Sequence, residues 1–324
     1  QTQRTIIGLG NNPNIGAVLI VSLEPVSAEI IKKDILRSGK KVETVTVQGE
    51  GGSINVIASG MRKAVSLVVD ATLHQREPFK LDNLVIGVEC GGSDTTSGIS
   101  SNPVLGKISD MIIENGGIVI LSETSEFLGA EHILAKRAAN STVSKKIINI
   151  VENVENETIR RGVNIREANP MPDNIKGGLT TIEEKSLGSI IKAGTKTIQG
   201  VLDYGEPPKG KGLFIMNTPA PGTDSLTGLA AGGVVLALFS TGVGIHIGHP
   251  VATTLKITGN PKTASTFIDN IDYTVCEVIQ GSKTIEEISA GLFQKVLFVA
   301  SGQKTKSEIL KQEENTISRI EPTV

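Results

Sequence analysis

Short apolar runs recur along the chain at lengths that suit β-strands. Most are continuously apolar rather than alternating, as expected for strands that are covered on both faces of a sheet. Patterns of helical period lie between several of them, for example at 27–38 and 54–71. Alternating strand and helix predicts an α/β fold, built of three-layer Rossmann-like domains with mostly parallel sheets. The apolar runs comprise residues 17–23, 42–47, 84–88, 118–121, 213–216, 234–239 and 254–257.

Capping residues predict where several helices begin. Asn102-Pro103 offers Asn as the N-cap and Pro at the first helical position, and that pattern ends at the Asn-Gly-Gly of 115–117. Capping boxes at 181–184 and 284–287 predict two further helix starts. The charged, amphipathic stretch 144–161 predicts a long surface or bridging helix.

A segment rich in Asn, Pro and Gly, residues 164–178, predicts a domain boundary. We therefore expect an α/β domain over residues 1–165, which carries the CGGSD and SETSE motifs, and a second α/β domain over 166–324 that completes the site. Residues 1–7 have a helical pattern without a capping residue, which suggests that the chain is a fragment of something longer.

The composition argues against nucleic acid and membrane partners. Lys and Arg number 32 against 34 Asp and Glu, and there is no Trp and only 2 Tyr, so basic patches and stacking platforms are scarce. No apolar run approaches the ~20 residues that span a bilayer, and no charged-then-apolar leader opens the chain. Two cysteines, Cys90 and Cys276, fit a reducing compartment. The sequence therefore predicts a soluble cytoplasmic protein.

The most informative polar residues follow two successive apolar runs. Cys90, Ser93 and Asp94 follow one run, and Glu123 and Glu126 follow the next. Ligands of α/β proteins usually bind where parallel strands end. We therefore expect a functional site at these positions.

Each of these residues also has a structural interpretation. A free Cys is often an apolar filler, but Cys90 precedes two glycines whose amides can approach a ligand, and a thiolate binds iron or zinc well. Ser93 and Asp94 could cap a turn, or they could bind a metal or a substrate carboxylate. Glu123 and Glu126 share a helix face, where they could compensate the helix dipole. That explanation is stronger for Glu126, because Glu123 lies at the strand end.

Small polar residues also follow strands in the second half of the chain. Thr218 follows the run at 213–216, and Thr241 follows the run at 234–239. Lys256 lies within a strand, where it either snorkels at an edge or provides a buried cation for an acid substrate. The glycine spacings do not match a dinucleotide-binding fingerprint, which disfavours a dinucleotide-dependent oxidoreductase.

Several long blocks of this sequence resemble the altronate/galactarate dehydratase family, and together they cover nearly the whole chain. Loops at 217–224 and 244–250, and part of an acidic block at 267–272, depart from the family pattern. The blocks that carry the resemblance are 89–94 (ECGGSD), 97–103, 122–126, 129–132, 169–174, 177–188, 226–228, 239–242 and 301–308.

The resemblance implies a lyase that removes water from a sugar acid, such as altronate or galactarate, to give a 2-keto-3-deoxy acid. It implies a divalent metal, Fe²⁺ or alternatively Mn²⁺. A related branch eliminates sulfite from sulfolactate, and a non-catalytic sugar-acid-binding subunit is a further alternative. The family carries a His-Gly-Cys-type segment upstream, so an N-terminal SAF-like domain or a small subunit is an expected partner beside the hydroxy-acid substrate. A homo-oligomer is left open.

Position at the strand ends and the resemblance together assign roles. We expect Cys90, Glu123 and Asp94 to be catalytic, with Cys90 and Glu123 as metal ligands and Glu123 as ligand or base. The residues expected to bind substrate are Ser93, Asn102, Thr218, Thr241 and Lys256, and Asp94 is expected to contact the substrate as well.

Overall fold

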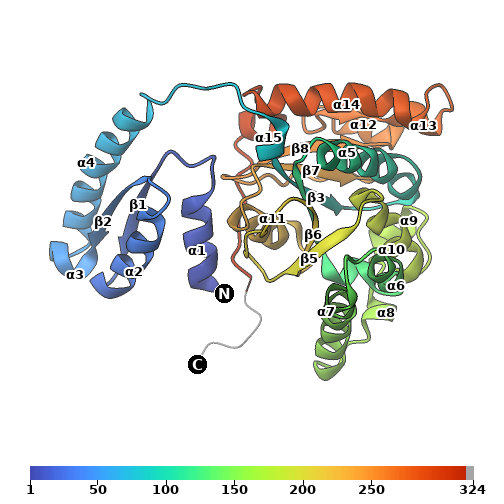
Figure 1. The fold of residues 1–324 in the computed structure, drawn as a ribbon, viewed down its shortest axis with the longest axis horizontal. Coiled ribbons are helices and arrows are strands. Elements are labelled where there is room, and N and C mark those ends of the chain that lie inside the picture. The colour runs from blue at the N-terminus through green and yellow to red at the C-terminus, as the bar shows by residue number, and fades with distance from the viewer. Residues whose placement is uncertain (319–324) are drawn as a thin grey trace.

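The computed structural model describes residues 1–318, which form two parallel sheets (Figure 1). The smaller sheet pairs β1 (Ala17–Ser22) with β2 (Lys41–Thr46). Helices α2 (Pro25–Leu36) and α4 (Ser53–Ala71) pack against it. This βαβα unit arises from the first two apolar runs and the helical patterns that follow them.

A seven-stranded sheet forms the centre of the remaining chain (Figure 1). Its strands run parallel in the order β5-β6-β4-β3-β7-β8-β9. The inner strands are buried on both faces, which explains their continuously apolar sequences. The expected parallel α/β fold is therefore confirmed. The strands are β3 (Val85–Gly91), β4 (Ile118–Leu121), β5 (Ile198–Leu202), β6 (Gly212–Met216), β7 (Leu236–Thr241), β8 (Thr253–Thr258) and β9 (Tyr273–Thr274).

Helices cover both faces of this sheet and make it the middle of three layers. On one face, α5 (Asn102–Glu114) and α14 (Ile285–Ala300) pack on side chains such as Val88 of β3. On the other face, α11 (Gly222–Ala231) packs on side chains such as Phe239 of β7. The other helices are α3 (Val47–Glu50), α6 (Glu131–Lys136), α7 (Ser141–Arg160), α8 (Ile165–Ala168), α9 (Pro172–Lys176), α10 (Ile182–Ile190), α12 (Pro261–Thr266), α13 (Cys276–Ile279) and α15 (Lys306–Ile309).

The first helix, α1 (Thr2–Asn11), lies between the two sheets and contacts both α2 and α11 (Figure 1). Gly8 permits this approach, because a side chain there would collide with the backbone of Ala231. The segment 72–80 then connects α4 to the large sheet.

The strands do not follow the division into 1–165 and 166–324 that the sequence predicted. β3 and β4 come from the first of these segments, yet β3 pairs with β7 and β4 pairs with β6 from the second. A cut at residue 165 would therefore separate hydrogen-bonded neighbours of one sheet. The Asn-, Pro- and Gly-rich segment instead contributes short helices beside that sheet.

Most of the predicted helix starts are confirmed. The Thr181 hydroxyl accepts a hydrogen bond from Glu184 N at the start of α10, and Thr284 and Glu287 form a capping box at the start of α14. The prediction that Asn102 is an N-cap was wrong. This residue lies inside the helix, whose N-cap is Ser101, because a π-helical turn over Ser97–Ser101 leads directly into α5.

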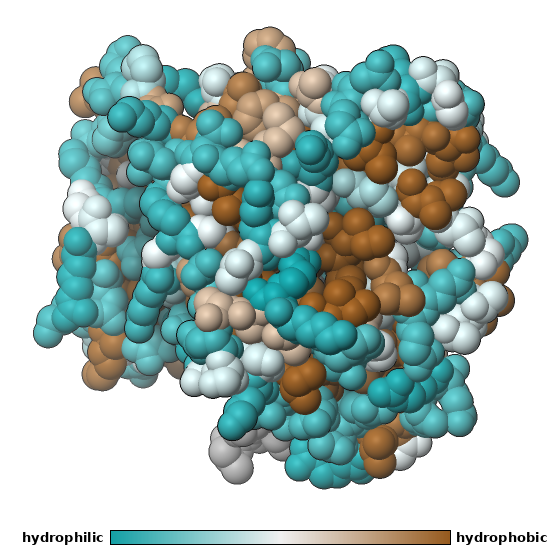
Figure 2. All heavy atoms as spheres, turned by 45° about the vertical axis from the view of Figure 1, so that its right-hand side comes forward, coloured by the Kyte–Doolittle hydropathy of each residue, from teal (hydrophilic) through white to brown (hydrophobic). Residues whose placement is uncertain are grey.

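Among residues 1–318, no helix combines the length and the apolar character that a membrane crossing requires. The face drawn in Figure 2 is mostly hydrophilic, but apolar patches interrupt it on the side where α5 and α10 lie.

Candidate active site

Two adjacent strand ends bring a thiol and a carboxylate together. β3 and β4 pair in register, with Val88 opposite Leu121, so the residues that follow these positions emerge at the same edge of the sheet. The backbone N–H of Cys90 donates to Glu123 Oε2 at 2.9 Å. Glu123 has a φ of 71°, in the left-handed region that residues other than glycine rarely adopt. Such strain persists where the surrounding structure enforces it, often at functional sites.

Glu126 completes a compact group of potential metal ligands. Its Oε2 atom lies 3.1 Å from Cys90 Sγ. One ligand atom each from Cys90, Glu123 and Glu126 lies within 4.8 Å of the other two, and all three residues are buried. The structure thus unites Cys90 and Glu123 as expected. It also adds Glu126, for which dipole compensation had been the stronger explanation.

Two buried lysines that the sequence analysis missed contact this group. Lys192 donates from Nζ to Glu123 Oε2 at 2.8 Å, to Cys90 Sγ at 3.1 Å and to Ser189 Oγ at 2.6 Å. Lys185 Nζ lies 3.0 Å from Glu126 Oε1. The two lysines are seven residues apart, so α10 and the turn after it direct both to one side. The same side carries the buried Ile182 and Ser189, a mixed pattern that does not distinguish these lysines from lysines on a helix surface.

Burial and mutual repulsion perturb the acidic groups. Burial, with repulsion from Glu126, raises the pKa of Glu123 to about 7. Burial, with repulsion from Glu123 and Glu126, holds the pKa of Cys90 well above its ordinary value. Burial also opposes ionisation of Glu126, but Lys185 and Lys192 outweigh it and lower the pKa of that carboxyl. The metal-free site therefore favours a protonated thiol.

The same charges keep both lysines protonated. Burial disfavours the Lys192 ammonium, but the acidic groups of Cys90, Glu123 and Glu126 outweigh it and raise its pKa. Glu126 likewise overcomes burial and raises the pKa of Lys185.

A second buried hydrogen-bond network contacts the backbone of Glu123. Ser225 Oγ donates to Glu89 Oε2 at 2.8 Å, and Ser122 Oγ donates to the same oxygen. The hydroxyl of Thr218 lies 3.0 Å from that of Ser225. The Thr218 hydroxyl also accepts a hydrogen bond from the backbone N–H of Glu123 at 2.8 Å. Thr218 therefore holds the strained Glu123 backbone, whereas the sequence had suggested a substrate contact.

A cavity of about 270 Å³ lies beside the group of ligands. Lys185 lines it and also contacts Glu126, so its ammonium connects the cavity to the buried group. Asn102 lines it too. Its amide donates to Gly188 O at 2.8 Å, while its Oδ1 atom is buried without a hydrogen-bond partner among the described residues. The other polar residues that line the cavity are Ser93, Asp94, Thr95, Ser97 and Glu184.

The carboxylate of Asp94 is engaged by its own loop and by a neighbouring one. Oδ1 accepts from Thr96 Oγ1 at 2.6 Å and from Ser97 N at 3.0 Å, and Oδ2 accepts from Asn260 Nδ2 at 2.7 Å. Asn174 Nδ2 donates to Ser93 O at 2.8 Å. These bonds shape the cavity wall.

Two of the expected substrate-binding residues make other contacts. Thr241 Oγ1 accepts from Gly244 N at 3.1 Å. Lys256 donates from Nζ to His246 O at 2.9 Å, to Ile247 O at 3.1 Å and to Gln312 Oε1 at 2.5 Å. β8, which carries Lys256, lies two strands away from β3. Lys256 thus anchors loops and the C-terminal segment rather than reaching the Cys90 group.

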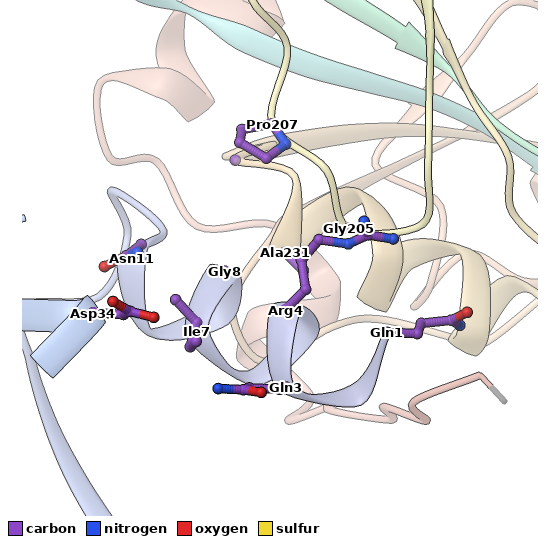
Figure 3. A pocket seen from close by; sticks show the side chains of 11 residues that line it. Gln1, Gln3, Arg4, Ile7, Gly8, Asn11, Asp34, Gly205, Pro207 and Ala231 are labelled. Carbon is purple, nitrogen blue, oxygen red and sulfur yellow. The ribbon is translucent and has the colours of Figure 1, made fainter. Parts of the chain in front are cut away.

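A larger cavity, of about 550 Å³, lies elsewhere, between α1 and the segments around Gly205 and Ala231 (Figure 3). Arg4 and Asn11 line it, but none of the Cys90, Glu123 and Glu126 side chains does. These three side chains do not line the smaller cavity either, but Lys185 lines that cavity and pairs with Glu126, so the smaller cavity is the one connected to the buried group.

Comparison with known proteins identifies the family. The profile described as D-galactarate/altronate dehydratase, C-terminal, matches residues 81–323. The profile described as D-galactarate dehydratase/altronate hydrolase, second domain, matches residues 1–72. The chain belongs to the D-galactarate/altronate dehydratase family. The resemblance seen in the sequence is thereby confirmed, and the two matched segments coincide with the small and the large sheet.

Three curated relatives are identical to this family member at about a third of the aligned positions. The (2R)-sulfolactate sulfo-lyase subunit beta of Chromohalobacter salexigens is 37% identical over 98% of this chain and 82% of its own length. The galactarate dehydratase (L-threo-forming) of Escherichia coli is 33% identical over 93% of this chain and 59% of its own length. The altronate dehydratase of Bacillus subtilis is 33% identical over 95% of this chain and 61% of its own length. The chain thus spans about three-fifths of each dehydratase.

The donor set fits the divalent metal that the family resemblance implies, on one condition. A thiolate and two carboxylates suit Fe²⁺ and similar ions, and Glu123 Oε1 has no hydrogen-bond partner among the described residues. The ammonium of Lys192, however, contacts both Cys90 and Glu123. The ion would fit once that ammonium moved away.

Proposed function

We propose that this chain forms the catalytic part of a metal-assisted hydro-lyase, which removes water from a sugar acid such as altronate or galactarate. The product is a 2-keto-3-deoxy acid. One observation carries the proposal: Lys185 joins the buried Cys90, Glu123 and Glu126 group to a cavity of mixed polar and apolar lining at the strand ends. Family membership supports the lyase class.

The cavity offers the contacts that a hydroxy acid needs. The ammonium of Lys185 can bind the substrate carboxylate through charge-assisted hydrogen bonds. The unpartnered Oδ1 atom of Asn102 can accept a hydrogen bond from a substrate hydroxyl. Ser93 and Asp94 complete the polar wall, with Asp94 held in place by its own hydrogen bonds.

Glu123 is the proposed base. Its Oε2 atom accepts the backbone N–H of Cys90, which leaves Oε1 to take the proton from the carbon next to the substrate carboxylate. The electron pair of that C–H bond forms the C=C bond as the hydroxyl on the neighbouring carbon leaves as hydroxide, which takes a proton from solvent to become water. The enol then gains a proton at that neighbouring carbon and loses its hydroxyl proton to solvent, which gives the 2-keto acid. A divalent metal held by Cys90, Glu123 and Glu126 would supply Lewis-acid stabilisation of the developing negative charge.

A sulfo-lyase is the second candidate. The relative that matches 98% of this chain at 37% identity is named as a sulfolactate sulfo-lyase subunit. Its named reaction would share the removal of a proton next to a carboxylate, with sulfite as the leaving group in place of hydroxide. The same buried group could therefore serve either elimination.

We also propose a partner that covers the cavity. Ile99, Leu187 and Ile191 line the cavity and are exposed to solvent by 62%, 46% and 42%. Exposed apolar side chains that line a cavity favour coverage by another protein surface. The N-terminal SAF-like domain or small subunit implied by the family resemblance is the proposed cover. A chain that only binds sugar acids would stay inactive even with that cover.

The test is an elimination assay on anaerobically purified protein supplied with Fe²⁺ or Mn²⁺, with and without the N-terminal part. Altronate, galactarate and sulfolactate are offered in turn, and 2-keto acid and sulfite are measured separately. Release of 2-keto acid from a sugar acid supports the hydro-lyase, and sulfite release supports the second candidate. Failure of every substrate with the N-terminal part present would leave only the binding-subunit alternative.

A further inference from the structure

Lys192 is placed where a metal ion would have to bind. Its Nζ atom contacts Cys90 Sγ and Glu123 Oε2, two of the three potential ligand atoms. The side chain is completely buried, and Ser189 Oγ accepts its third hydrogen bond. The ammonium therefore uses all three of its donors inside the site.

The buried charges balance without a metal. Glu123 pairs with Lys192, and Glu126 pairs with Lys185, so each carboxylate already has an ammonium partner. A divalent ion added to this arrangement would bring positive charge next to the Lys192 ammonium. Like charges buried at close range repel strongly, because little water is present to screen them.

We propose that Lys192 is a built-in cation that competes with the divalent metal for Cys90 and Glu123, so that metal binding displaces its ammonium from both. Lys192 stabilises the metal-free site and limits metal affinity. This inference rests on the proposed function only in assuming that a metal binds at this group. The alternative is that Lys192 stays in place and the metal binds elsewhere.

The test measures the affinity of Fe²⁺, and of Mn²⁺ as a separate probe, by anaerobic equilibrium dialysis. Lys192→Met removes the charge, and Lys192→Gln removes it while keeping a hydrogen-bond donor in case the first variant does not fold. Lys256→Met is the matched control, because Lys256 is equally buried but bonds to carbonyl oxygens and Gln312 outside the group. We expect the Lys192 variants to bind metal more than about tenfold more tightly, and the control to bind as the parent does.

Thermal unfolding gives a readout that is independent of activity. Metal should raise the melting temperature of the Lys192 variants more than that of the parent, and adding Cys90→Ala should abolish the gain. Equal metal affinity in parent and variants would overturn the proposed competition, but metal binding as assumed in the proposed function would still stand. Binding by none of them would overturn both the competition and the metal-assisted part of the proposed function.

Discussion

The Lys192 ammonium lies 2.8 Å from Glu123 Oε2, and both side chains are completely shielded from solvent. Such a pair contributes little net stability relative to apolar packing, since both charges lose their hydration on folding. Removing one partner is different, because the other charge stays buried without compensation. Without metal, replacing both partners of the pair should therefore lower the stability of the protein less than replacing only one of them.

For Lys192→Met in metal-free protein we expect the free energy of unfolding to fall by about 3–5 kcal/mol, the range found when a buried ion pair loses one partner. Denaturant titration measures this change. Adding Glu123→Gln should recover part of the loss, because the double variant no longer buries an unpaired carboxylate. A single variant within about 1 kcal/mol of the parent, or a double variant that is less stable still, would contradict the pairing.

Glu123→Gln should lose turnover in protein that still folds, although the unpaired Lys192 ammonium lowers its free energy of unfolding. The amide cannot take a proton, and a positioned general base typically contributes about 10²–10⁴-fold to the rate. We expect kcat to fall by that factor with a smaller change in KM, measured as 2-keto acid release. Glu152→Gln, on the exposed face of α7, is the control. Turnover within about threefold of the parent would remove Glu123 from the role of base.

Lys185→Met should act mainly on substrate binding. A hydrogen bond to a charged group contributes about 1.5–3 kcal/mol, which corresponds to a rise in KM of roughly 10–150-fold. Lys185→Arg keeps the positive charge and should recover part of the affinity. A fall in kcat without a rise in KM would instead show that Lys185 acts through its contact with Glu126.

The sequence predicted the parallel α/β architecture because strands covered on both faces need apolar side chains throughout. The meeting of Cys90 and Glu123 was also predictable. Successive strands of a parallel sheet are often neighbours, and their carboxyl ends share an edge. The family resemblance added the lyase class, which the comparisons then supported.

Other parts of the site depend on tertiary contacts that the sequence does not show. Lys185 and Lys192 have the sequence of ordinary helix-surface lysines, and their burial follows only from how α10 packs against the strand ends. For Lys256, the sequence indicated the burial but not the contacts. Its strand position indicated a buried cation correctly, but the acceptors turned out to be backbone carbonyls of a distant loop. Asn102 was misplaced as a cap because the π-helical turn before α5 has no simple sequence pattern.

His249 should make the protein less stable in mild acid. Its Nδ1 atom accepts hydrogen bonds from Val251 N at 3.2 Å and Ala252 N at 3.1 Å, which assigns the ring hydrogen to Nε2 beside Thr227. Burial lowers the pKa of His249 to about 4, against an ordinary value of about 6.5. The neutral ring therefore stabilises the fold fully above pH ~6.5, and this contribution is lost as the pH falls towards 4.

The expected loss is at most about 3.4 kcal/mol, from a pKa difference of about 2.5 units. His249→Asn keeps an acceptor near the Nδ1 position but cannot take up a proton. We expect this variant to be less stable than the parent at pH 7, with the difference shrinking between pH 6.5 and 4 in denaturant titrations. His74→Asn, at an exposed position in the segment 72–80, should leave the pH dependence of the parent unchanged. A parent–His249→Asn difference that stays constant over this range would show that the buried ring does not resist protonation.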